Sequence, residues 1–321
     1  MKVLIVKTSS MGDVIHTFPA VSDALAQRPD LTLDWCVEEP FAGLVALHPG
    51  IRHIHKVALR KWRKSAFSSA TRSALAQVKR DMRERRYDLV IDAQGLLKSV
   101  FLARLAGAPI AGFDRKSARE GVSAFSYRYR YHVARDLHAI IRTRLLFGAA
   151  LGYEPDLDRL DNGIVAPAGP TPPHGERTVF LLHGTSWESK KWPVESWIET
   201  ARMLTRQGFT PVTTWSNPAE QAVAASIASA VPETVVIERS PLTAIAAEIG
   251  RATLVIGADT GLMHLASAFG LPTIAIFLAT QPGLTGPLGP RSVVLEKGIS
   301  GEPVAPERVV AVAGELLSRP R

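Results

Sequence analysis

The sequence predicts an α/β protein of two doubly wound domains, in which helices cover both faces of a parallel sheet. Short apolar runs alternate with longer stretches of helical periodicity, as successive βα units require. The alternation breaks once, at a segment rich in proline and glycine, and then restarts. A length of 321 residues also exceeds what one domain usually holds.

The first half of the chain carries four expected strands separated by helical stretches. The strands are expected at residues 3–6, 31–37, 53–57 and 89–93. The helices are expected at residues 14–27, 66–86, 96–106 and 137–151. The apolar run that ends at Gln94 and Gly95 is typical of a buried parallel strand that leads into a turn.

The second half repeats the pattern after the break. Proline and glycine crowd the stretch from Pro167 to Gly175, so we expect a linker at residues 161–175 between domains at 1–160 and 176–321. Strands are expected at residues 179–183, 210–215, 235–238, 254–257 and 273–277, and helices at 193–207, 219–230, 242–250 and 260–269. Doubly wound sheets bind ligands beyond the carboxyl ends of their strands, so a cleft between the domains is the expected site.

The charge of the chain is unevenly divided. Residues 1–153 hold 25 Lys and Arg against 13 Asp and Glu, a net charge of +12, whereas residues 154–321 hold 13 against 17, a net charge of −4. A basic half indicates an anionic partner there. The single cysteine, Cys36, excludes an intramolecular disulfide and a cysteine metal cluster. No run is long enough for a transmembrane helix, and residues 3–6 are too short for a signal peptide, so we expect a cytoplasmic protein.

The first strand leads into a short loop that ends at Gly12 and Asp13, where a helix is expected to begin. Glycine turns of this kind often bind phosphate, but this one lacks a Gly-x-Gly-x-x-Gly pattern and a Walker lysine. A carboxylate at the start of the helix would repel a diphosphate, so the loop suits a proton acceptor better. The residues alone favour a simple helix cap for Asp13, a role that is compatible with that of a proton acceptor.

Basic side chains are concentrated at residues 60–86, where ten basic residues stand against two acidic ones. Aromatic residues are few and no nucleic-acid motif is present, so we do not expect a nucleic-acid partner. The later arginines fit a solvated helix face. The compact cluster of Arg60, Lys61, Arg63 and Lys64 follows a strand and suits a carboxylate or phosphate. Weaker candidates of the same kind are Arg119, and His138 together with Arg142.

Three loops of the second half carry polar residues suited to a nucleotide. Thr185, Ser186 and Lys190 follow the first strand and suit a diphosphate, although a surface loop explains them equally well. Glu220 could accept hydrogen bonds from a ribose diol, but a first-turn helix acid is an ordinary alternative. A third group follows a buried strand and opens a helix, and comprises Asp259, Thr260, Gly261 and His264. It suits the phosphates of a leaving group, or else a helix cap beside a core histidine.

These motifs resemble the lipopolysaccharide heptosyltransferases of glycosyltransferase family 9. The similarity is carried, in collinear order, by residues 3–14, Asp34-Trp35, residues 37–39, residues 60–64, residues 91–96 and residues 259–264. It implies a GT-B fold, with two Rossmann-like domains facing across a cleft. It also implies transfer of L-glycero-D-manno-heptose from ADP-heptose to the first Kdo sugar of Kdo–lipid A, with inversion, and with no cofactor and no metal.

The resemblance also assigns roles to residues. It places the catalytic base at Asp13, the donor site at Thr185, Ser186, Lys190, Glu220, Asp259, Thr260, Gly261 and His264, and the acceptor site at Arg60, Lys61, Arg63, Lys64 and Arg119. Ser186, Gly184 and Lys61 depart from the family pattern, where threonine, alanine and arginine are expected. Lys61 replaces a bidentate contact by a point charge, which affects acceptor preference.

The implied partners fit the charge division, because Kdo carboxylates and lipid A phosphates are anionic. The same basic surface predicts peripheral contact with the anionic cytoplasmic face of the inner membrane. Within the enzyme class, the alternative is the second heptosyltransferase, or another member with a different acceptor. From other classes, the alternatives are a non-catalytic protein that binds anionic glycolipid and nucleotide, and a nicotinamide oxidoreductase, which the missing glycine pattern disfavours.

Overall fold

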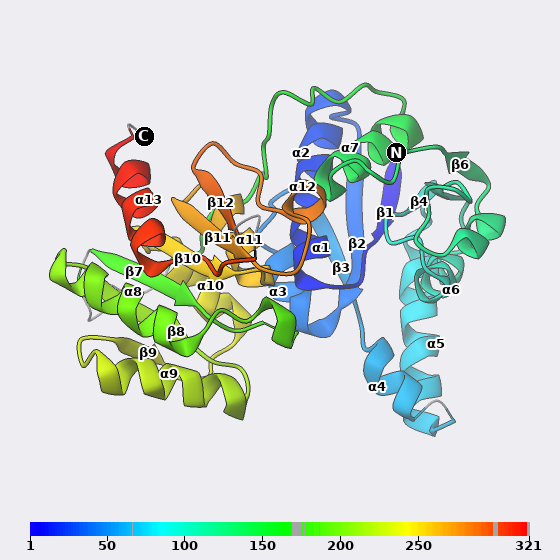
Figure 1. The fold of residues 1–321 in the computed structure, drawn as a ribbon. Helices are drawn as coiled ribbons and strands as arrows, with labels where there is room; N and C mark the ends of the chain where they lie inside the picture. The colour runs from blue at the N-terminus through cyan, green and yellow to red at the C-terminus, as the bar shows by residue number, and fades with distance from the viewer. Residues whose placement is uncertain (66, 169–174, 176, 186, 298–300, 320–321) are drawn as a thin grey trace. The chain divides into compact units, whose positions relative to one another are not determined.

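The computed structural model describes residues 1–321 except 66, 169–174, 176, 186, 298–300 and 320–321. The chain forms two compact units, Met1–Ile164 and Val165–Arg321. Each unit contains one six-stranded parallel sheet with helices on both faces (Figure 1). None of the helices in the described part of the chain has the length and apolar character that crossing a bilayer requires.

The sheet of the first unit has the strand order β3-β2-β1-β4-β5-β6. Its strands are β1 (Lys2–Val6), β2 (Thr32–Glu38), β3 (Ile51–Val57), β4 (Leu89–Asp92), β5 (Ile110–Phe113) and β6 (Tyr129–Tyr131). This is the order of a dinucleotide-binding fold, in which the winding direction reverses between β1 and β4. The loops that follow β1 and β4 therefore lie side by side at the point where such folds bind ligands.

The described residues of the first unit also form seven helices and two 3₁₀ turns, and all of them except α7 lie between these strands in the sequence. The helices are α1 (Met11–Ile15), α2 (Phe18–Gln27), α3 (Ala42–Val45), α4 (Leu59–Lys64), α5 (Ser69–Glu84), α6 (Leu97–Leu105) and α7 (Ala139–Leu151), and the turns are η1 (Glu39–Phe41) and η2 (Gly121–Ser126). The single helix expected at residues 14–27 is wrong, because the stretch forms two helices. Pro19 lacks a backbone donor and occupies the first turn of α2, where that loss is tolerated.

The second unit repeats the topology, with the strand order β12-β11-β10-β7-β8-β9. Its strands are β7 (Thr178–Leu182), β8 (Thr210–Thr214), β9 (Val235–Ile237), β10 (Leu254–Ala258), β11 (Thr273–Phe277) and β12 (Ser292–Glu296). The reversal falls between β7 and β10, whose strands pair directly. The loops after these two strands are therefore the ones expected to bind a ligand.

Two apolar cores cover the two faces of the second sheet. The helical elements are η3 (Glu188–Lys190), α8 (Val194–Arg206), α9 (Pro218–Ala230), α10 (Leu242–Gly250), α11 (Gly261–Ala268), α12 (Pro282–Thr285) and α13 (Pro306–Ser318). One core joins α8, α9 and α13 around Trp197, and the other joins α10 and α11 around Met263. Burial of one large apolar side chain stabilises the folded unit by about 1.5–3 kcal/mol. The packed cores therefore hold the loops at the strand ends in place.

Candidate active site

Asp13 occupies the third position of α1, directly after the loop that follows β1. Its Oδ2 accepts hydrogen bonds from the Ser10 backbone N–H at 2.9 Å and from the Ser10 hydroxyl at 3.1 Å. This is the reciprocal contact by which a first-turn acid caps a helix. The helix-cap interpretation of Asp13 is therefore correct for one of its two carboxylate oxygens.

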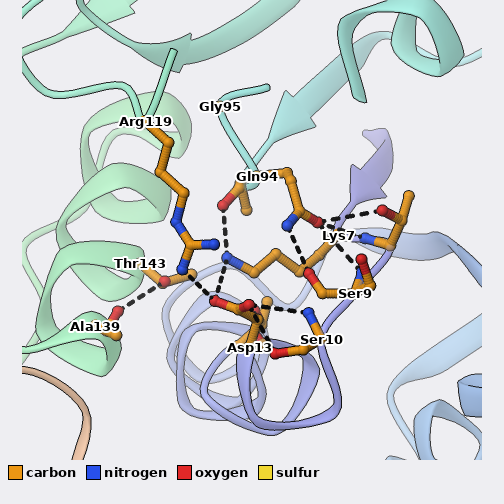
Figure 2. Close-up of polar contacts among 12 residues, drawn as sticks. Lys7, Ser9, Ser10, Asp13, Gln94, Gly95, Arg119, Ala139 and Thr143 are labelled. Carbon is orange, nitrogen blue, oxygen red and sulfur yellow. Dashed lines mark hydrogen bonds and ion pairs between the residues drawn. The ribbon is translucent and has the colours of Figure 1, made fainter. Parts of the chain in front are cut away.

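The other oxygen of Asp13 faces two cations. Nη2 of Arg119 lies 2.7 Å from Oδ1, and Nζ of Lys7 lies 3.7 Å from the same atom (Figure 2). Lys7 is buried at the end of β1, and its ammonium also donates to the backbone carbonyl of Ala93 at 2.9 Å. Arg119 is half-exposed, whereas the Asp13 side chain is only 12% exposed. A largely buried carboxylate is thus paired with one buried and one half-exposed cation.

These contacts keep Asp13 ionised. Burial on its own raises the pKa of the carboxyl, but the two cations and the Ser10 amide outweigh it and hold the pKa well below its ordinary range. Burial lowers the pKa of the Lys7 ammonium, and the charge of Asp13 partly restores it. The ion pair is therefore mutually stabilised in a largely dry environment.

Gln94 holds the loop after β1 against the end of β4. Its Oε1 accepts from the backbone N–H groups of Thr8 at 2.8 Å and Ser9 at 3.3 Å, and its Nε2 donates to the Ser9 carbonyl at 2.5 Å (Figure 2). The next residue, Gly95, has a φ of +69°, and a Cβ there would lie 3.3 Å from the Arg119 backbone nitrogen. The turn after β4 therefore positions both sides of the Asp13 site.

Asp92, the last residue of β4, holds the turn after β4 in place. Its buried carboxylate accepts from the Gln94 N–H at 2.9 Å, from the Ser99 hydroxyl at 2.8 Å and from the Tyr127 hydroxyl at 2.8 Å. Burial raises the pKa of Asp92, and these donors counteract the rise. A satisfied polar network of this kind gives the turn one well-defined conformation.

The basic cluster lies on α4 and divides by helix face. Arg60 and Arg63, three residues apart, line a cavity of about 390 Å³ together with Glu38, Leu59, Trp62, Thr71, Leu75, Lys98 and Phe101. All four basic residues of α4 are exposed, but Lys61 and Lys64 are absent from that lining. Nζ of Lys98 donates to the Ser9 hydroxyl at 3.0 Å, so this lysine connects the cavity with the Asp13 loop.

The arginines further along the basic stretch are largely exposed, which agrees with a solvated helix face. Arg85 is the exception, because its Nε lies 2.7 Å from Oδ2 of the buried Asp34. Among the basic residues at 60–86, the arginines that line a cavity are therefore the two on α4, Arg60 and Arg63.

Asp259 is the centre of the polar loops in the second unit. Its Oδ2 lies 2.6 Å from Nζ of Lys190 and accepts from the Thr280 hydroxyl at 2.7 Å. The Thr185 hydroxyl donates to its backbone carbonyl at 3.2 Å, and Nε2 of His264 lies 3.9 Å from its Oδ1. The structure thus brings together residues that follow β7, β10 and β11, all at the carboxyl edge of the sheet.

The start of α11 also lies in this group. Thr260 is the residue before the helix and Gly261 is its first residue, so free backbone N–H groups are at this edge. Asp259 itself stands one residue before the cap position. The interpretation of Asp259 as a bare helix cap is therefore wrong, because its carboxylate bonds to other loops instead. Ser186 lies outside the described residues.

Glu220 belongs to the first turn of α9. Its Oε2 accepts from the Ser216 backbone N–H and hydroxyl, each at 2.7 Å, so the first-turn interpretation holds. Its carboxylate also lies beside Gly184, where an added Cβ would be 2.9 Å from Cδ of Glu220. Glycine at 184 thus allows this carboxylate to approach the loop that follows β7.

Several residues of the two groups were not singled out from the sequence. Lys7, Gln94, Lys98 and Thr280 each contact a predicted site residue or its loop. A lysine directly after a buried strand and a hydroxyl three residues after another strand are signals that could have identified Lys7 and Thr280. In the described part of the chain, no group of three or more His, Cys, Asp and Glu side chains is arranged to hold a metal ion.

Comparison with known proteins identifies the family. The profile of glycosyltransferase family 9 (heptosyltransferase) matches residues 75–308. Lipopolysaccharide heptosyltransferase 1 of Pseudomonas aeruginosa is 41% identical over 300 residues, which cover 92% of this chain and 83% of the relative. Two similar solved structures are those of Escherichia coli heptosyltransferase WaaC, one with ADP and one with ADP-2-deoxy-2-fluoro heptose.

The first of these structures has a TM-score of 0.92 and the second 0.88, each at 35% identity. The first covers 98% of this chain and 100% of its own, and the second covers 98% and 99%. The predicted GT-B class, with two parallel Rossmann-like sheets, is confirmed by this similarity, and so is the prediction of a glycosyltransferase. The chain belongs to glycosyltransferase family 9, the heptosyltransferases.

Proposed function

We propose that this heptosyltransferase moves L-glycero-D-manno-heptose from ADP-heptose to the first Kdo sugar of Kdo–lipid A, with Asp13 as the catalytic base. The observation that carries the proposal is the Asp13 carboxylate, ionised and held between Lys7 and Arg119 at the reversal of the first sheet. The name of the similar Pseudomonas aeruginosa protein supports the acceptor class, and the titles of the similar structures support the donor.

The donor site proposed for the second unit is the group around Asp259. Lys190, oriented by Asp259, neutralises the diphosphate of ADP, and the hydroxyls of Thr185 and Ser186 donate to it. The start of α11 at Thr260 and Gly261 adds backbone donors and a favourable dipole, with His264 one turn along. Glu220 accepts from the ribose diol. Every described member of this set lies at the carboxyl edge of its sheet, which supports the assignment.

The acceptor site proposed for the first unit is basic. Kdo carries a carboxylate and lipid A carries phosphates, and residues 1–153 have a net charge of +12. Arg60, Lys61, Arg63 and Lys64 on α4 bind these anions. Arg119 binds the Kdo carboxylate, since its guanidinium is half-exposed and lies beside the base.

The chemistry is a single displacement that inverts the anomeric centre. The acceptor oxygen attacks the anomeric carbon on the face opposite ADP as the bond to the diphosphate breaks, and positive charge develops on the sugar. Asp13 takes the proton of the attacking hydroxyl. The departing ADP carries away the electron pair and is stabilised by Lys190 and the helix start.

The low pKa of Asp13 is compatible with this role only if the acceptor changes its surroundings. A carboxylate paired with two cations is a weak proton acceptor. A Kdo carboxylate that draws Arg119 to itself removes one of the two cations from Oδ1, and the proton affinity of Asp13 rises. Asp13 thereby becomes an effective base only when the acceptor is bound. Without the acceptor, it stays paired with both cations and does not activate water.

Peripheral contact with the cytoplasmic face of the inner membrane is part of the proposal. A lipid-anchored acceptor places the enzyme at a bilayer, and an anionic leaflet attracts a basic surface by about 1 kcal/mol per Lys or Arg near it. The α4 cluster is exposed and supplies such a surface.

The test is Asp13→Asn, assayed for ADP release with ADP-heptose and Kdo–lipid A. We expect turnover to fall about 10²- to 10⁴-fold while ADP-heptose binding, measured by calorimetry, is retained. Asp30→Asn, at an exposed carboxylate that pairs with Arg28, is the matched control and should behave as the wild type. Near-normal turnover by the Asp13 variant would remove Asp13 as the base.

The acceptor is tested separately. Wild-type enzyme is supplied with Kdo–lipid A or with an already heptosylated acceptor, and the first should be preferred. Preference for the second would make the chain a heptosyltransferase II, and donor binding without ADP release in either mixture would favour a non-catalytic binding protein.

A further inference from the structure

A second cavity lies on the second unit, at the edge of the sheet opposite the Asp259 loops. It has a volume of about 750 Å³. Its lining includes Arg177 just before β7, Thr253 just before β10, Pro272 just before β11 and Arg291 just before β12. These residues stand at the amino ends of parallel strands, whereas the Asp259 group stands at the carboxyl ends. The cavity is therefore separate from the proposed donor site.

The cavity is strongly cationic. Four arginines line it, Arg177, Arg251, Arg291 and Arg319, and its twelve described lining residues include no Asp or Glu. Residues 165–321 hold 12 Lys and Arg against 13 Asp and Glu, a net charge of −1. A third of the basic residues of a nearly neutral unit thus gather around one cavity.

Two of these guanidinium groups have buried nitrogens that lack a partner. Nη2 of Arg251 and Nε of Arg291 make no hydrogen bond with any residue that the structure describes. Glu248 pairs with Arg251, but through the other nitrogen, Nη1, at 3.1 Å. Burying a charged donor without an acceptor costs folding free energy. A bound anion that accepts from such a donor is an ordinary explanation for its presence.

The remaining wall indicates what kind of anion fits. The Arg177 guanidinium lies over the Phe209 ring at 4.4 Å, which holds it in place, and Leu271, Pro272 and Leu317 supply apolar surface. Arginines offer paired donors that match the oxygens of a phosphate group. A volume of this size exceeds what a single phosphate needs and accommodates an organic group attached to it.

We propose that this cavity is a second anion site, which binds the phosphate group of a small phosphorylated molecule between Arg251 and Arg291. Arg177 and Arg319 close the site from the exposed side. The apolar wall contacts the rest of the ligand. The proposal does not depend on the assignment of the donor site or of the acceptor.

The experiment measures binding of pyrophosphate by calorimetry and by thermal denaturation, at matched ionic strength in sodium chloride. We expect the wild type to bind and to be stabilised. Added to Lys190→Ala, the pair Arg251→Gln and Arg291→Gln should weaken the pyrophosphate binding that Lys190→Ala retains by at least 10-fold. The control is Arg202→Gln on α8, whose arginine is exposed and pairs with Glu199, and it should bind like the wild type.

Two further variants keep the test decisive. Arg177→Ala with Arg319→Ala removes only exposed side chains, so the fold is retained and binding should still weaken severalfold. Lys190→Ala should leave part of the pyrophosphate binding intact, because the cavity lies at the amino ends of the strands and the Asp259 group lies at their carboxyl ends. Complete loss of binding in Lys190→Ala, or unchanged binding in both arginine pairs, would overturn the proposal.

A third experiment distinguishes a small phosphorylated molecule from a lipid headgroup as the ligand of the cavity. Vesicles of phosphatidylglycerol are compared with vesicles of phosphatidylcholine in a flotation assay. The proposal expects equal flotation of the wild type and of the Arg251→Gln, Arg291→Gln variant. Loss of flotation on anionic vesicles in that variant alone would assign the cavity to a lipid headgroup and contradict the small-molecule assignment.

Discussion

Nη2 of Arg119 lies 2.7 Å from Oδ1 of Asp13, on the same oxygen that Lys7 approaches to 3.7 Å, while Oδ2 caps α1 through Ser10. The two oxygens of this carboxylate therefore have different roles, since one caps a helix and the other pairs with two cations. In the mechanism proposed above, the oxygen that faces the cations takes the proton, and the half-exposed arginine is the partner that the acceptor displaces.

Arg119→Ala should raise the KM for Kdo–lipid A about 10- to 100-fold, because a hydrogen bond between charged groups contributes about 1.5–3 kcal/mol. Arg119→Lys should recover part of the loss, since charge is restored without the paired donors. Steady-state kinetics at fixed ADP-heptose measures the effect. Lys116→Ala, exposed in the same loop, is the control, and an unchanged acceptor KM in Arg119→Ala would argue against the assignment.

Asp13→Asn should destabilise the protein in a pH-dependent way. The folded-state pKa of Asp13 is depressed, so its stabilising contribution is complete above the unfolded pKa of about 3.9 and is lost as pH falls through the folded pKa. The variant should lose about 1–3 kcal/mol of unfolding free energy at pH 7, where Lys7 stays buried without its carboxylate.

Urea denaturation at a series of pH values from 7 to 3.5 checks this expectation. The gap between wild type and variant should be constant above about pH 5 and should narrow below pH 4. A gap that is the same at every pH would mean that Asp13 acts through packing and not through its charge.

Gly95→Ala should reduce both stability and turnover. The positive φ of Gly95 costs a side chain about 1–2 kcal/mol, and the new Cβ would meet the Arg119 backbone nitrogen at 3.3 Å. Gly152→Ala is the matched control, because φ there is +77° and nothing lies within 4 Å of the added Cβ. Thermal denaturation should show similar losses for the two, whereas the acceptor KM should rise only for Gly95→Ala. Equal kinetics would show that the turn does not position Arg119.

Lys190→Ala should weaken ADP-heptose binding about 10-fold or more, because it removes a charge-assisted contact with the diphosphate and the ion pair that Lys190 makes with Asp259. Lys191→Ala removes a neighbouring lysine that pairs with Glu188 at the surface, and it should change donor binding less than about twofold. Calorimetric titration with ADP-heptose compares the two. Similar values for both variants would count against the diphosphate role of Lys190.

The two faces of α4 should differ in their effect on the acceptor. Arg60→Ala with Arg63→Ala removes two positive charges from the lining of the 390 Å³ cavity. Lys61→Ala with Lys64→Ala removes the same charge from outside that lining. We expect the arginine pair to raise the acceptor KM at least 10-fold and the lysine pair a fewfold. The effect of the lysine pair should vanish in 0.5 M salt, because screening suppresses exposed charges. Equal losses for the two pairs would indicate binding to net charge alone.

Most of the fold follows from the sequence because buried parallel strands are apolar runs with clear ends. Three strands were missed, β5, β6 and β12, and the first two of them lack a clear apolar run. In β5, Gly112 interrupts the run because the Tyr127 ring occupies the space of a side chain, 2.4 Å from where a Cβ would stand. In β6, the edge strand Tyr129–Tyr131 is largely exposed.

The site was less predictable than the fold, for a physical reason. Loop residues such as Asp13 and Asp259 are recognisable because they follow buried strands. Their partners are set by tertiary packing, and Arg119 reaches Asp13 across 106 positions of sequence. The depressed pKa of Asp13 depends on that contact and on Lys7, so it could not be deduced from the loop alone. Thr280 joins Asp259 across 21 positions for the same reason.

The contacts described for Asp13 come from residues 7–119, and those described for Asp259 come from residues 185–280. Each half of the proposed site is thus assembled inside one compact unit, by a sheet of its own. Evolution can therefore exchange one half and conserve the other. A lineage that acquires a new acceptor needs to alter only the first unit, and a chimaera of two family members joined near residue 164 should inherit its nucleotide from one parent and its acceptor from the other.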